Sequence, residues 1–463
     1  MMTKQRVTAV FDIGRTNKKF FLFDEEFREV HREYVRFPEI TDEDGYPTED
    51  LPALQGWLRD VFDRILEART YEVEAINFSS YGASFVHLDA DGAVVTPLYN
   101  YTKPLDPDLT AQFYARYGPE ATFTAATGSA NDGMLNSGMQ LYWLKHRKPE
   151  VFARIKYSLH LPQFLSYVFT GIPISEYTSI GCHTALWDYA RQDYHPWVYA
   201  EGLHRILPPI VSTETSINMN YNGRRMKIGV GIHDSSAALL PYIRSEADPF
   251  VLISTGTWSI TLNPFGGGAL SAQDLAANCI NYMRIDGKPV KAARLFLGEE
   301  YKTQVRRLAQ HFGVDEDTHR NVRFDYGIYR AVLEDFVPWF RLEKIDYPGN
   351  PGETRIPTDD YAIAYHHLMV ELVELQARSI VTAMGDTPVR TLFIDGGFSD
   401  NEVFVQLISH RFRAQELRTT DASLGSALGA AICISDRHLN SLFLKKNYGL
   451  KKHQPFIIKE ADA

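Results

Sequence analysis

The chain has 463 residues, too many for one ordinary hydrophobic core, so we expect two domains of roughly 200 residues each. With 44% hydrophobic and 23% charged residues, it has the composition of a folded globular protein and not of a disordered one. Its 48 basic and 58 acidic side chains give a formal net charge of −10, which argues against general binding to nucleic acid or to an anionic membrane.

The cysteines and the N-terminus indicate an intracellular enzyme. Cys182, Cys279 and Cys433 are widely spaced and include no C-x-x-C pair, so neither a disulfide framework nor a zinc site is indicated. We expect each to be a small buried hydrophobic side chain. The N-terminus shows no long apolar region before a cleavage site, and no run of about 18 apolar residues follows. We therefore expect a cytoplasmic location.

The first part of the chain mixes strand and helix patterns, as expected of an α/β domain. Strands are predicted over residues 7–14, 18–27, 74–82 and 85–95, with turns at Asp24-Glu25-Glu26 and at Asp91-Gly92. A helix is predicted over residues 51–68, because apolar side chains recur there at helical spacing. Lys18 and Lys19 have the context of surface charges, and we assign them no role.

The middle of the chain is more helical and more aromatic. A helix over residues 136–155 is predicted to break near Pro149, and a second over 159–171 is predicted to end at Gly171, which suits a left-handed cap. Aromatic side chains such as Trp143 and Phe164 are most simply core residues.

A new strand pattern starts at residue 249, after a polar segment over 242–249 that ends in proline. We place the domain boundary there, giving domains 1–245 and 246–463. Further on, the sequence predicts a helix over 361–384, a strand over 391–397 and another helix from Asn401. Residues 348–352 read as a surface loop, and the lysine-rich segment 444–453 as a solvated tail.

Three short glycine-containing turns each follow a predicted strand. They are DIGRTNKK (12–19), STGTWS (254–259) and DGGFSDN (395–401). Glycine allows close approach of the backbone, and hydroxyl and N–H groups can hold phosphate oxygens. Each turn alone is more simply a tight hairpin, and none matches the G-x-x-x-x-G-K-[ST] or G-x-G-x-x-G patterns. Their order along the chain is the more specific signal.

A fourth segment, GVGIHDSSAALLP (229–241), places Asp234 among small and apolar residues. The carboxylate has three interpretations from sequence: a helix N-cap, a partner for a buried cation, or a catalytic base. Ser235 or Ser236 could cap the following helix as well as an aspartate could, so capping alone does not explain the acid. A helix N-terminus would help to keep Asp234 ionised.

The order of these four segments resembles that of the FGGY carbohydrate kinase family, within the actin and hexokinase superfamily. The resemblance covers nearly the whole chain. It implies an α/β fold of two ribonuclease-H-like domains that face each other across a cleft, with the sugar held mainly by the first and ATP mainly by the second. Such an enzyme transfers phosphate from ATP to a sugar hydroxyl with the help of Mg²⁺.

The resemblance also implies roles for individual residues on the nucleotide side. Asp12 would face the Mg²⁺ shell, although a structural turn aspartate is the alternative. The remaining candidate ATP-binding residues are Gly14, Arg15, Thr16 and Asn17 in the first segment, Gly256 and Thr257 in the second, and Gly396, Gly397 and Asn401 in the third. Arg15 departs from the family, which commonly has a small hydroxyl residue there.

On the sugar side, Asp234 matches the family's catalytic aspartate, and His233 and Ser235 are its expected neighbours in the pocket. His233 is nearly as well explained as a core histidine. SSYGASFVHLD (79–89) is similar to a strand that places a glycine, here Gly82, against the sugar, with Tyr81 beside it. The segment over 99–104 departs from the family's usual sugar-contacting pattern, and 293–301 lacks the asparagine found in rhamnulose kinases.

These features are closest to rhamnulose and fuculose kinases. We therefore expect an ATP-dependent kinase for a ketose, such as the deoxyketoses L-rhamnulose or L-fuculose, and a possible homodimer. The alternatives are xylulose, ribulose or a polyol as substrate, or a non-catalytic sugar-responsive binding or regulatory protein. Retention of Asp234 with all three nucleotide segments favours the enzyme.

Overall fold

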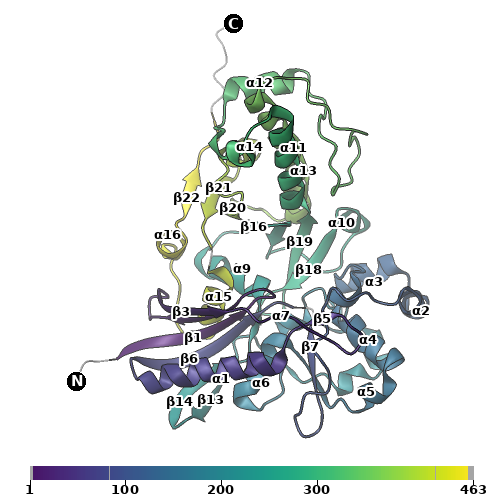
Figure 1. Cartoon of the computed structure of the whole chain (residues 1–463), viewed down its shortest axis with the longest axis vertical. Helices are drawn as coiled ribbons and strands as arrows, with labels where there is room; N and C mark the ends of the chain where they lie inside the picture. Colours follow the sequence, from purple (N-terminus) through teal and green to yellow (C-terminus); the bar gives the residue numbers. More distant parts are fainter. Residues whose placement is uncertain (1–3, 83, 423, 457–463) are drawn as a thin grey trace.

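The computed structural model describes residues 4–82, 84–422 and 424–456. It shows two lobes, each built around a seven-stranded sheet (Figure 1). Among the described residues, no helix is both long and apolar enough to cross a membrane. The three cysteines are buried and form no disulfide, as expected.

The first sheet has the strand order β13-β14-β6-β1-β2-β3, with β15 paired to β6. Its strands are β1 (Gln5–Ile13), β2 (Lys18–Phe23), β3 (Glu29–Val35), β6 (Tyr71–Ser80), β13 (Ser216–Tyr221), β14 (Arg224–Gly229) and β15 (Ile232–His233). Strands β1, β2 and β3 form an antiparallel meander, whereas β6 runs parallel to β1. Helix α1 (Leu51–Ala68) has the predicted limits and buries its apolar stripe in this lobe, after Asp50 caps its first turn.

The second sheet repeats this arrangement in the order β18-β19-β17-β16-β20-β21-β22. Its strands are β16 (Phe250–Thr255), β17 (Ser259–Asn263), β18 (Cys279–Met283), β19 (Pro289–Leu295), β20 (Thr391–Gly396), β21 (Glu416–Thr420) and β22 (Lys451–His453). The predicted strand segment over 249–265 is the hairpin of β16 and β17. As β1 does in the first sheet, β16 has an antiparallel neighbour on one side and a parallel neighbour, β20, on the other.

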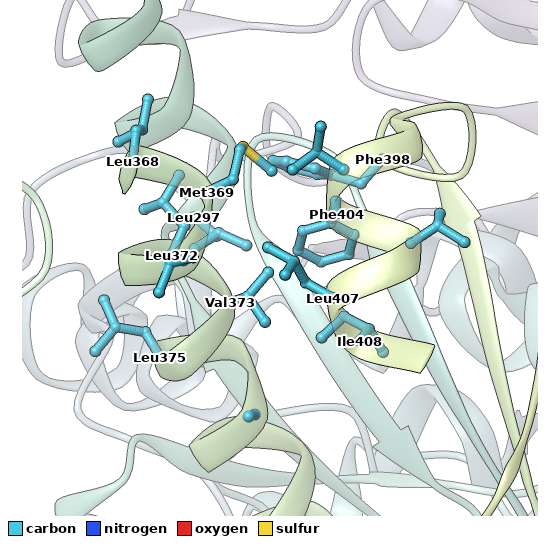
Figure 2. Packing of buried hydrophobic residues seen from close by; sticks show 14 of the residues in the cluster. Leu297, Leu368, Met369, Leu372, Val373, Leu375, Phe398, Phe404, Leu407 and Ile408 are labelled. Carbon is cyan, nitrogen blue, oxygen red and sulfur yellow. The ribbon is translucent and has the colours of Figure 1, made fainter. Parts of the chain in front are cut away.

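Helices bury the largest core of the second lobe. In Figure 2, Leu372 and Val373 of α13 (Tyr361–Met384) face Phe404 and Leu407 of α14 (Glu402–Arg411). Each large apolar side chain buried in this way contributes about 1.5–3 kcal/mol. Further helices of this lobe include α10 (Ala272–Ala276), α11 (Leu297–Phe312), α12 (Tyr326–Glu334) and the 3₁₀ helix η3 (Glu316–Asn321).

The middle of the chain is a helical insertion in the first lobe. Its helices are α2 (Pro107–Tyr117), α3 (Glu120–Thr127), α4 (Ser137–Arg147), α5 (Pro149–Ala153), α6 (Leu161–Thr170), α7 (Tyr177–Ile180), α8 (Pro196–Ala200), η1 (Gly133–Leu135) and η2 (Leu203–Arg205). The predicted break at Pro149 is present, and Gly171 caps α6 with a φ of 66°. Trp143 and Phe164 are buried, which confirms them as core residues.

Short strand pairs complete the first lobe. They are β4 (Ile40–Thr41) with β5 (Pro47–Thr48), β7 (Phe85–Leu88) with β8 (Tyr157–His160), β9 (Ser175–Glu176) with β12 (Ile210–Val211), and β10 (Trp187–Asp188) with β11 (Asp193–Tyr194). Because residues 157–160 form β8, the predicted helix over 159–171 begins two residues late, at Leu161. The turn predicted at Asp91-Gly92 is present, with Gly92 at a φ of 80°.

Helices α9 (Asp234–Ser245) and α15 (Gly425–Cys433) lie side by side where the two lobes meet (Figure 1). They touch at the backbone: a Cβ on Gly429 would lie 1.8 Å from the carbonyl oxygen of Ala237. The lysine-rich segment is not a solvated tail, because it forms α16 (Phe443–Asn447) and then β22 at the edge of the second sheet, with Leu444 and Tyr448 buried. The boundary between residues 245 and 246 stays a prediction, and it lies in the connection from α9 to β16.

Candidate active site

The sheet register of the first lobe brings Asp12 and Asp234 to the same edge. In parallel pairing with β6, Asp12 of β1 lies opposite Ser79, and Ile232 of β15 lies opposite that same Ser79. Because carboxyl ends of parallel strands meet at one edge of a sheet, the residues that follow β15 face the end of β1. Asp234 is one of these residues and the first residue of α9.

Burial dominates the electrostatics of both carboxyl groups. Loss of hydration raises the pKa of Asp234 from 3.8 to about 6, even though two hydrogen bonds from Ser235 oppose the shift. Loss of hydration likewise raises the pKa of Asp12 to about 6; the charge of Asp234 adds to this increase, while Ser426 and Lys19 oppose it. The backbone N–H of Ser235 at the helix N-terminus lowers the pKa of Asp234, but the loss of hydration outweighs it.

The geometry around Asp234 separates its three interpretations. It does not cap α9, because it is the first helical residue and its Oδ1 accepts the N–H of Ser235 at 2.6 Å. Among the described residues, its ion-pair contacts include no Lys or Arg. Its side chain is 35% exposed, so a substrate can reach it. An accessible carboxylate with a raised pKa has the properties of a general base.

His233 is both a buried histidine and the direct neighbour of this carboxylate. Burial lowers the pKa of His233 to about 3, so its ring is neutral. Its Nε2 lies 3.2 Å from Asp234 Oδ1, whereas Nδ1 has no hydrogen-bond partner among the described residues. We therefore assign the ring proton to Nε2, which donates to Asp234. The ring stacks on Tyr282, with centroids 5.7 Å apart.

The other residues expected on the sugar side lie around this pair. Ser235 Oγ is 3.3 Å from Asp234 Oδ1, and the Tyr81 hydroxyl donates to Glu49 at 2.8 Å. Gly82 makes room for protein groups: a Cβ there would lie 2.5 Å from Cys182 Sγ and 3.0 Å from the ring of His233. The absent side chain of Gly82 thus allows Cys182 and His233 to approach each other.

The turn after β1 contains Gly14, Arg15, Thr16 and Asn17, and it is closed by a hydrogen bond from Gly14 N–H to Asn17 O. Arg15 and Thr16 are exposed. Arg15 approaches Glu39 at 3.7 Å and the ring of Tyr101 at 5.2 Å. Its guanidinium therefore lies beside the segment over 99–104, which we expected to concern the sugar.

Lys18 is not a surface charge. Its side chain is only 3% exposed, and its Nζ forms an ion pair with Glu49 at 2.8 Å and donates to the carbonyl oxygen of Arg15 at 2.7 Å. Lys18 therefore holds the turn after β1 in place. The sequence alone could not show this, because Glu49 is distant in the chain.

In the second lobe, two of the expected nucleotide segments lie against each other. Gly397 N–H donates to Thr255 O at 2.8 Å, and Thr255 Oγ1 donates to Asp395 O at 2.5 Å. Gly396 has a φ of 86°, and a Cβ there would lie 2.1 Å from Thr255 O, so the close approach requires glycine. Gly256, Thr257, Gly396 and Gly397 in the adjoining turns are exposed, as are Trp258 and Asp400 of the same segments.

Asn401 is used by the protein itself. Its Oδ1 accepts the N–H of Phe404 and caps α14, and its Nδ2 donates to the Tyr365 hydroxyl at 2.8 Å. These contacts orient α14 behind the turn that follows β20. The structure thus gives Asn401 an evident structural function, and a contact with a nucleoside stays a prediction.

Two residues that we did not single out from sequence complete the site. Ser426, in the first turn of α15, donates from Oγ to Asp12 Oδ1 at 3.0 Å. Gly298, in the first turn of α11, would place a Cβ 1.8 Å from Gly256 O. The only sequence signals for them were small residues near helix starts, which are too common to be specific.

Direct contacts join the lobes next to this site. Arg294 of β19 forms an ion pair with Asp132 of the first lobe at 2.8 Å. Ser236 of α9 donates from its hydroxyl to Met283 O of β18, also at 2.8 Å. The edge of the second sheet therefore packs close to the residue that follows Asp234.

Comparison with known proteins decides the family. The sequence model for the N-terminal domain of the FGGY family of carbohydrate kinases matches residues 7–238, and the model for the FGGY C-terminal domain matches residues 247–441. The chain belongs to the FGGY family of carbohydrate kinases. It is therefore an ATP-dependent carbohydrate kinase with the two-domain fold of the actin and hexokinase superfamily, as the sequence predicted.

Individual relatives of this FGGY kinase differ in the sugar they are named for, and the solved structures among them share its fold. A rhamnulokinase from Pectobacterium atrosepticum is 24% identical over 490 residues, which covers 98% of this chain and 94% of the relative. A carbohydrate kinase from Novosphingobium aromaticivorans superimposes with a TM-score of 0.79 at 24% identity, covering 98% and 95% of the two chains. A xylulose kinase from Rhodospirillum rubrum gives 0.77 at 16% identity, covering 97% and 94%.

Proposed function

We propose that this FGGY kinase phosphorylates a hydroxyl of a ketose, and that the ketose is a deoxy sugar such as L-rhamnulose or L-fuculose. The observation that carries the proposal is the accessible carboxylate of Asp234 beside the neutral ring of His233, at the sheet edge that also presents Asp12. The names of the curated relatives support the choice of sugar.

In this proposal Asp234 is the general base. The sugar hydroxyl oxygen forms a bond to the γ-phosphorus of ATP, the bond from that phosphorus to the β–γ bridging oxygen breaks, ADP leaves, and the hydroxyl proton passes to Asp234. The hydrogen bonds that Asp234 accepts from Ser235 and His233 all go to Oδ1. Among the described residues this leaves Oδ2 for the substrate proton.

We place the phosphates of ATP against Gly14–Asn17 in the first lobe, and against Gly256, Thr257, Gly396 and Gly397 in the second. The N–H groups of Gly14, Gly256 and Gly397 are already bound to carbonyl oxygens, so we propose the exposed Thr16 and Thr257 hydroxyls as donors to phosphate oxygens, with the glycines allowing close approach. Asn401 caps α14, the helix that follows the turn after β20, and we propose that this position brings it near the nucleoside of ATP.

Asp12 fits a Mg²⁺ ion that accompanies ATP. Its partly buried carboxylate has a pKa raised by loss of hydration, which the nearby charge of Lys19 opposes, and a divalent cation would offset the cost of desolvating this charge. An oxygen ligand of this kind suits Mg²⁺, which takes one or two protein carboxylates and keeps several waters. When bound, the ion neutralises charge on the phosphates.

On the sugar side we propose that Tyr81, Ser235 and His233 border the substrate. Gly82 acts indirectly, because its missing side chain admits the ring of His233. The cytoplasmic location and the homodimer stay predictions from the sequence.

The decisive experiment is ADP release with a panel of ketoses and polyols, including L-rhamnulose, L-fuculose, xylulose and ribulose. We expect one deoxyketose to give the highest kcat/KM. Asp234→Asn should lower turnover by at least about 10²-fold while calorimetry still detects ATP binding, since a general base contributes about 10²–10⁴-fold. If no ketose or polyol stimulates ADP release, the proposed substrate class is refuted. Near-normal turnover of Asp234→Asn removes this residue from the base position.

A further inference from the structure

Three soft or borderline metal-ligating side chains meet next to the proposed base. The potential ligand atoms of Cys182, His183 and His233 all lie within 4.8 Å of one another, and all three residues are buried. Two of them follow α7 and the third precedes α9, so the tertiary fold brings them together. The cysteine spacing along the chain had indicated no zinc site.

The surrounding contacts prepare these side chains as ligands. His183 Nδ1 lies 3.2 Å from Leu135 O, an acceptor that fixes the ring proton on Nδ1 and leaves the lone pair on Nε2. A hydrogen bond from the far ring nitrogen to a backbone carbonyl is the usual support of a metal-bound histidine. The ring nitrogen of His233 that faces Cys182 is Nε2, so metal binding there requires the ring proton to move to Nδ1, which in this residue, only 2% exposed, has no hydrogen-bond partner among the described residues.

The backbone makes room for the cluster. Gly82 has no side chain at the point where a Cβ would overlap both Cys182 Sγ and the ring of His233. His183 adopts a left-handed φ of 41°, and Asn136 Nδ2 holds its carbonyl oxygen at 2.7 Å. A left-handed backbone is costly for a side-chain-bearing residue, so this turn is stabilised by its surroundings.

We propose that Cys182, His183 and His233 form a binding site for a borderline-soft divalent cation, Zn²⁺ being the best match to these ligands. Donor atoms around tetrahedral Zn²⁺ lie about 3.3–3.7 Å apart, so side-chain adjustments of about 1 Å close the set. Binding converts the Cys182 thiol to a thiolate and releases its proton to solvent. The hard Mg²⁺ ion that accompanies ATP prefers oxygen ligands and does not compete for this site.

The position of the site gives it a regulatory consequence, which rests on the proposed function. Asp234 Oδ1 is 3.2 Å from His233 Nε2 but lies outside the 4.8 Å cluster, so a rotation of the Asp234 side chain toward the ion would make it the fourth ligand. A carboxylate that ligates Zn²⁺ is no longer available to accept the proton of the sugar hydroxyl. Zn²⁺ is therefore expected to inhibit phosphoryl transfer, reversibly and without occupying the nucleotide site.

The metal itself is tested with Co²⁺ as a spectroscopic probe on the full-length protein without substrates. We expect one Co²⁺ per chain, with visible bands of a tetrahedral ion and a near-ultraviolet thiolate-to-cobalt band that excess Zn²⁺ abolishes. Cys182→Ser should lose the thiolate band, and His183→Gln should weaken Co²⁺ binding at least tenfold.

Cys433→Ser is the matched control. Like Cys182, Cys433 is buried and its thiol donates to a backbone carbonyl at 3.4 Å, but it lies outside the cluster. It should keep the thiolate band. Thermal melting checks that each variant is folded. If Cys182→Ser does not fold, the loss of Co²⁺ affinity in His183→Gln tests the site instead. Absence of a thiolate band in the wild type, or its persistence in Cys182→Ser, overturns the metal site.

A second measurement tests inhibition with whichever sugar supports turnover. Zn²⁺ at saturating Mg²⁺ should inhibit the wild type, a chelator should reverse this, and Cys182→Ser should need at least tenfold more Zn²⁺. Equal inhibition of both proteins overturns the link to Asp234. Because the Co²⁺ spectra need no substrate, failure of the ketose assignment leaves the metal result intact.

Discussion

The raised pKa of Asp234 predicts an unusual acid limb in the pH profile of this FGGY kinase. The active form of a general base is deprotonated, so activity should fall as pH decreases through about 6. With this pKa, about nine-tenths of the carboxylate is ionised at pH 7 but only about one-tenth at pH 5, which predicts a nearly tenfold decrease. With the ordinary pKa of 3.8, more than about nine-tenths would still be ionised at pH 5.

The measurement is kcat/KM for the sugar between pH 4.5 and 8, at saturating Mg²⁺ and ATP for each pH. Circular dichroism over the same range shows that the protein stays folded. Asp12 has a similarly raised pKa in the absence of metal, but saturating Mg²⁺ keeps its carboxylate ionised, so the acid limb belongs to Asp234. An inflection near pH 4 refutes the argument that burial controls this base.

Two adjacent serines sharpen the test. The Ser235 hydroxyl helps to lower the pKa of Asp234, so Ser235→Ala should move the acid inflection to higher pH. Ser236→Ala is the matched control, because the Ser236 hydroxyl instead donates to Met283 O. An inflection that moves equally in both variants contradicts the assignment of the shift to a direct contact with Asp234.

Two further substitutions test the nucleotide side. Asp12→Asn should abolish turnover yet raise the free energy of unfolding at pH 7.5 by up to about 3 kcal/mol, because it removes a desolvated charge while the hydrogen bond from Ser426 can persist. This stabilisation should shrink as pH falls through about 6 and vanish below about 4. Denaturant unfolding that shows no stabilisation at pH 7.5 would contradict this prediction. Gly298→Ala should raise the KM for ATP at least tenfold and lower the Tm, because its Cβ would lie 1.8 Å from Gly256 O and overlap it. Gly352→Ala is the control and should change neither value, because no atom lies within 4 Å of the added Cβ. An unchanged KM in Gly298→Ala would show that this contact does not affect nucleotide binding.

Local features of the fold could be predicted from the sequence because short-range physics determines them. The apolar stripe of α1, the break at Pro149 and the left-handed cap at Gly171 each depend on residues within a few positions. The four motif segments were also recognisable, since each combines a strand end with a specific turn composition. The family and its two-domain fold followed from their order.

Burial and partners could not be predicted in the same way, because residues far apart in the chain supply them. Lys18 has the local context of a surface lysine, and only the approach of Glu49 makes it a buried ion pair. Segment 444–453 is lysine-rich along the chain, but pairing with β21 makes its last part a strand. Neither contact leaves a signal in the neighbouring sequence.

Some features of the site could likewise be predicted from the sequence, whereas others depend on segments that are distant in the chain. Residue type and spacing left Asp234 with three interpretations and each glycine turn as a simple hairpin; the resemblance of their order to the FGGY family identified Asp234 as the candidate base and the turns as candidate phosphate contacts. Only the tertiary structure decided the pKa of Asp234, the bond from Ser426 to Asp12 and the meeting of Cys182 with His183 and His233. The reason is that desolvation and ligand convergence depend on which distant segments fill the space around a side chain, and the order of residues does not encode that locally.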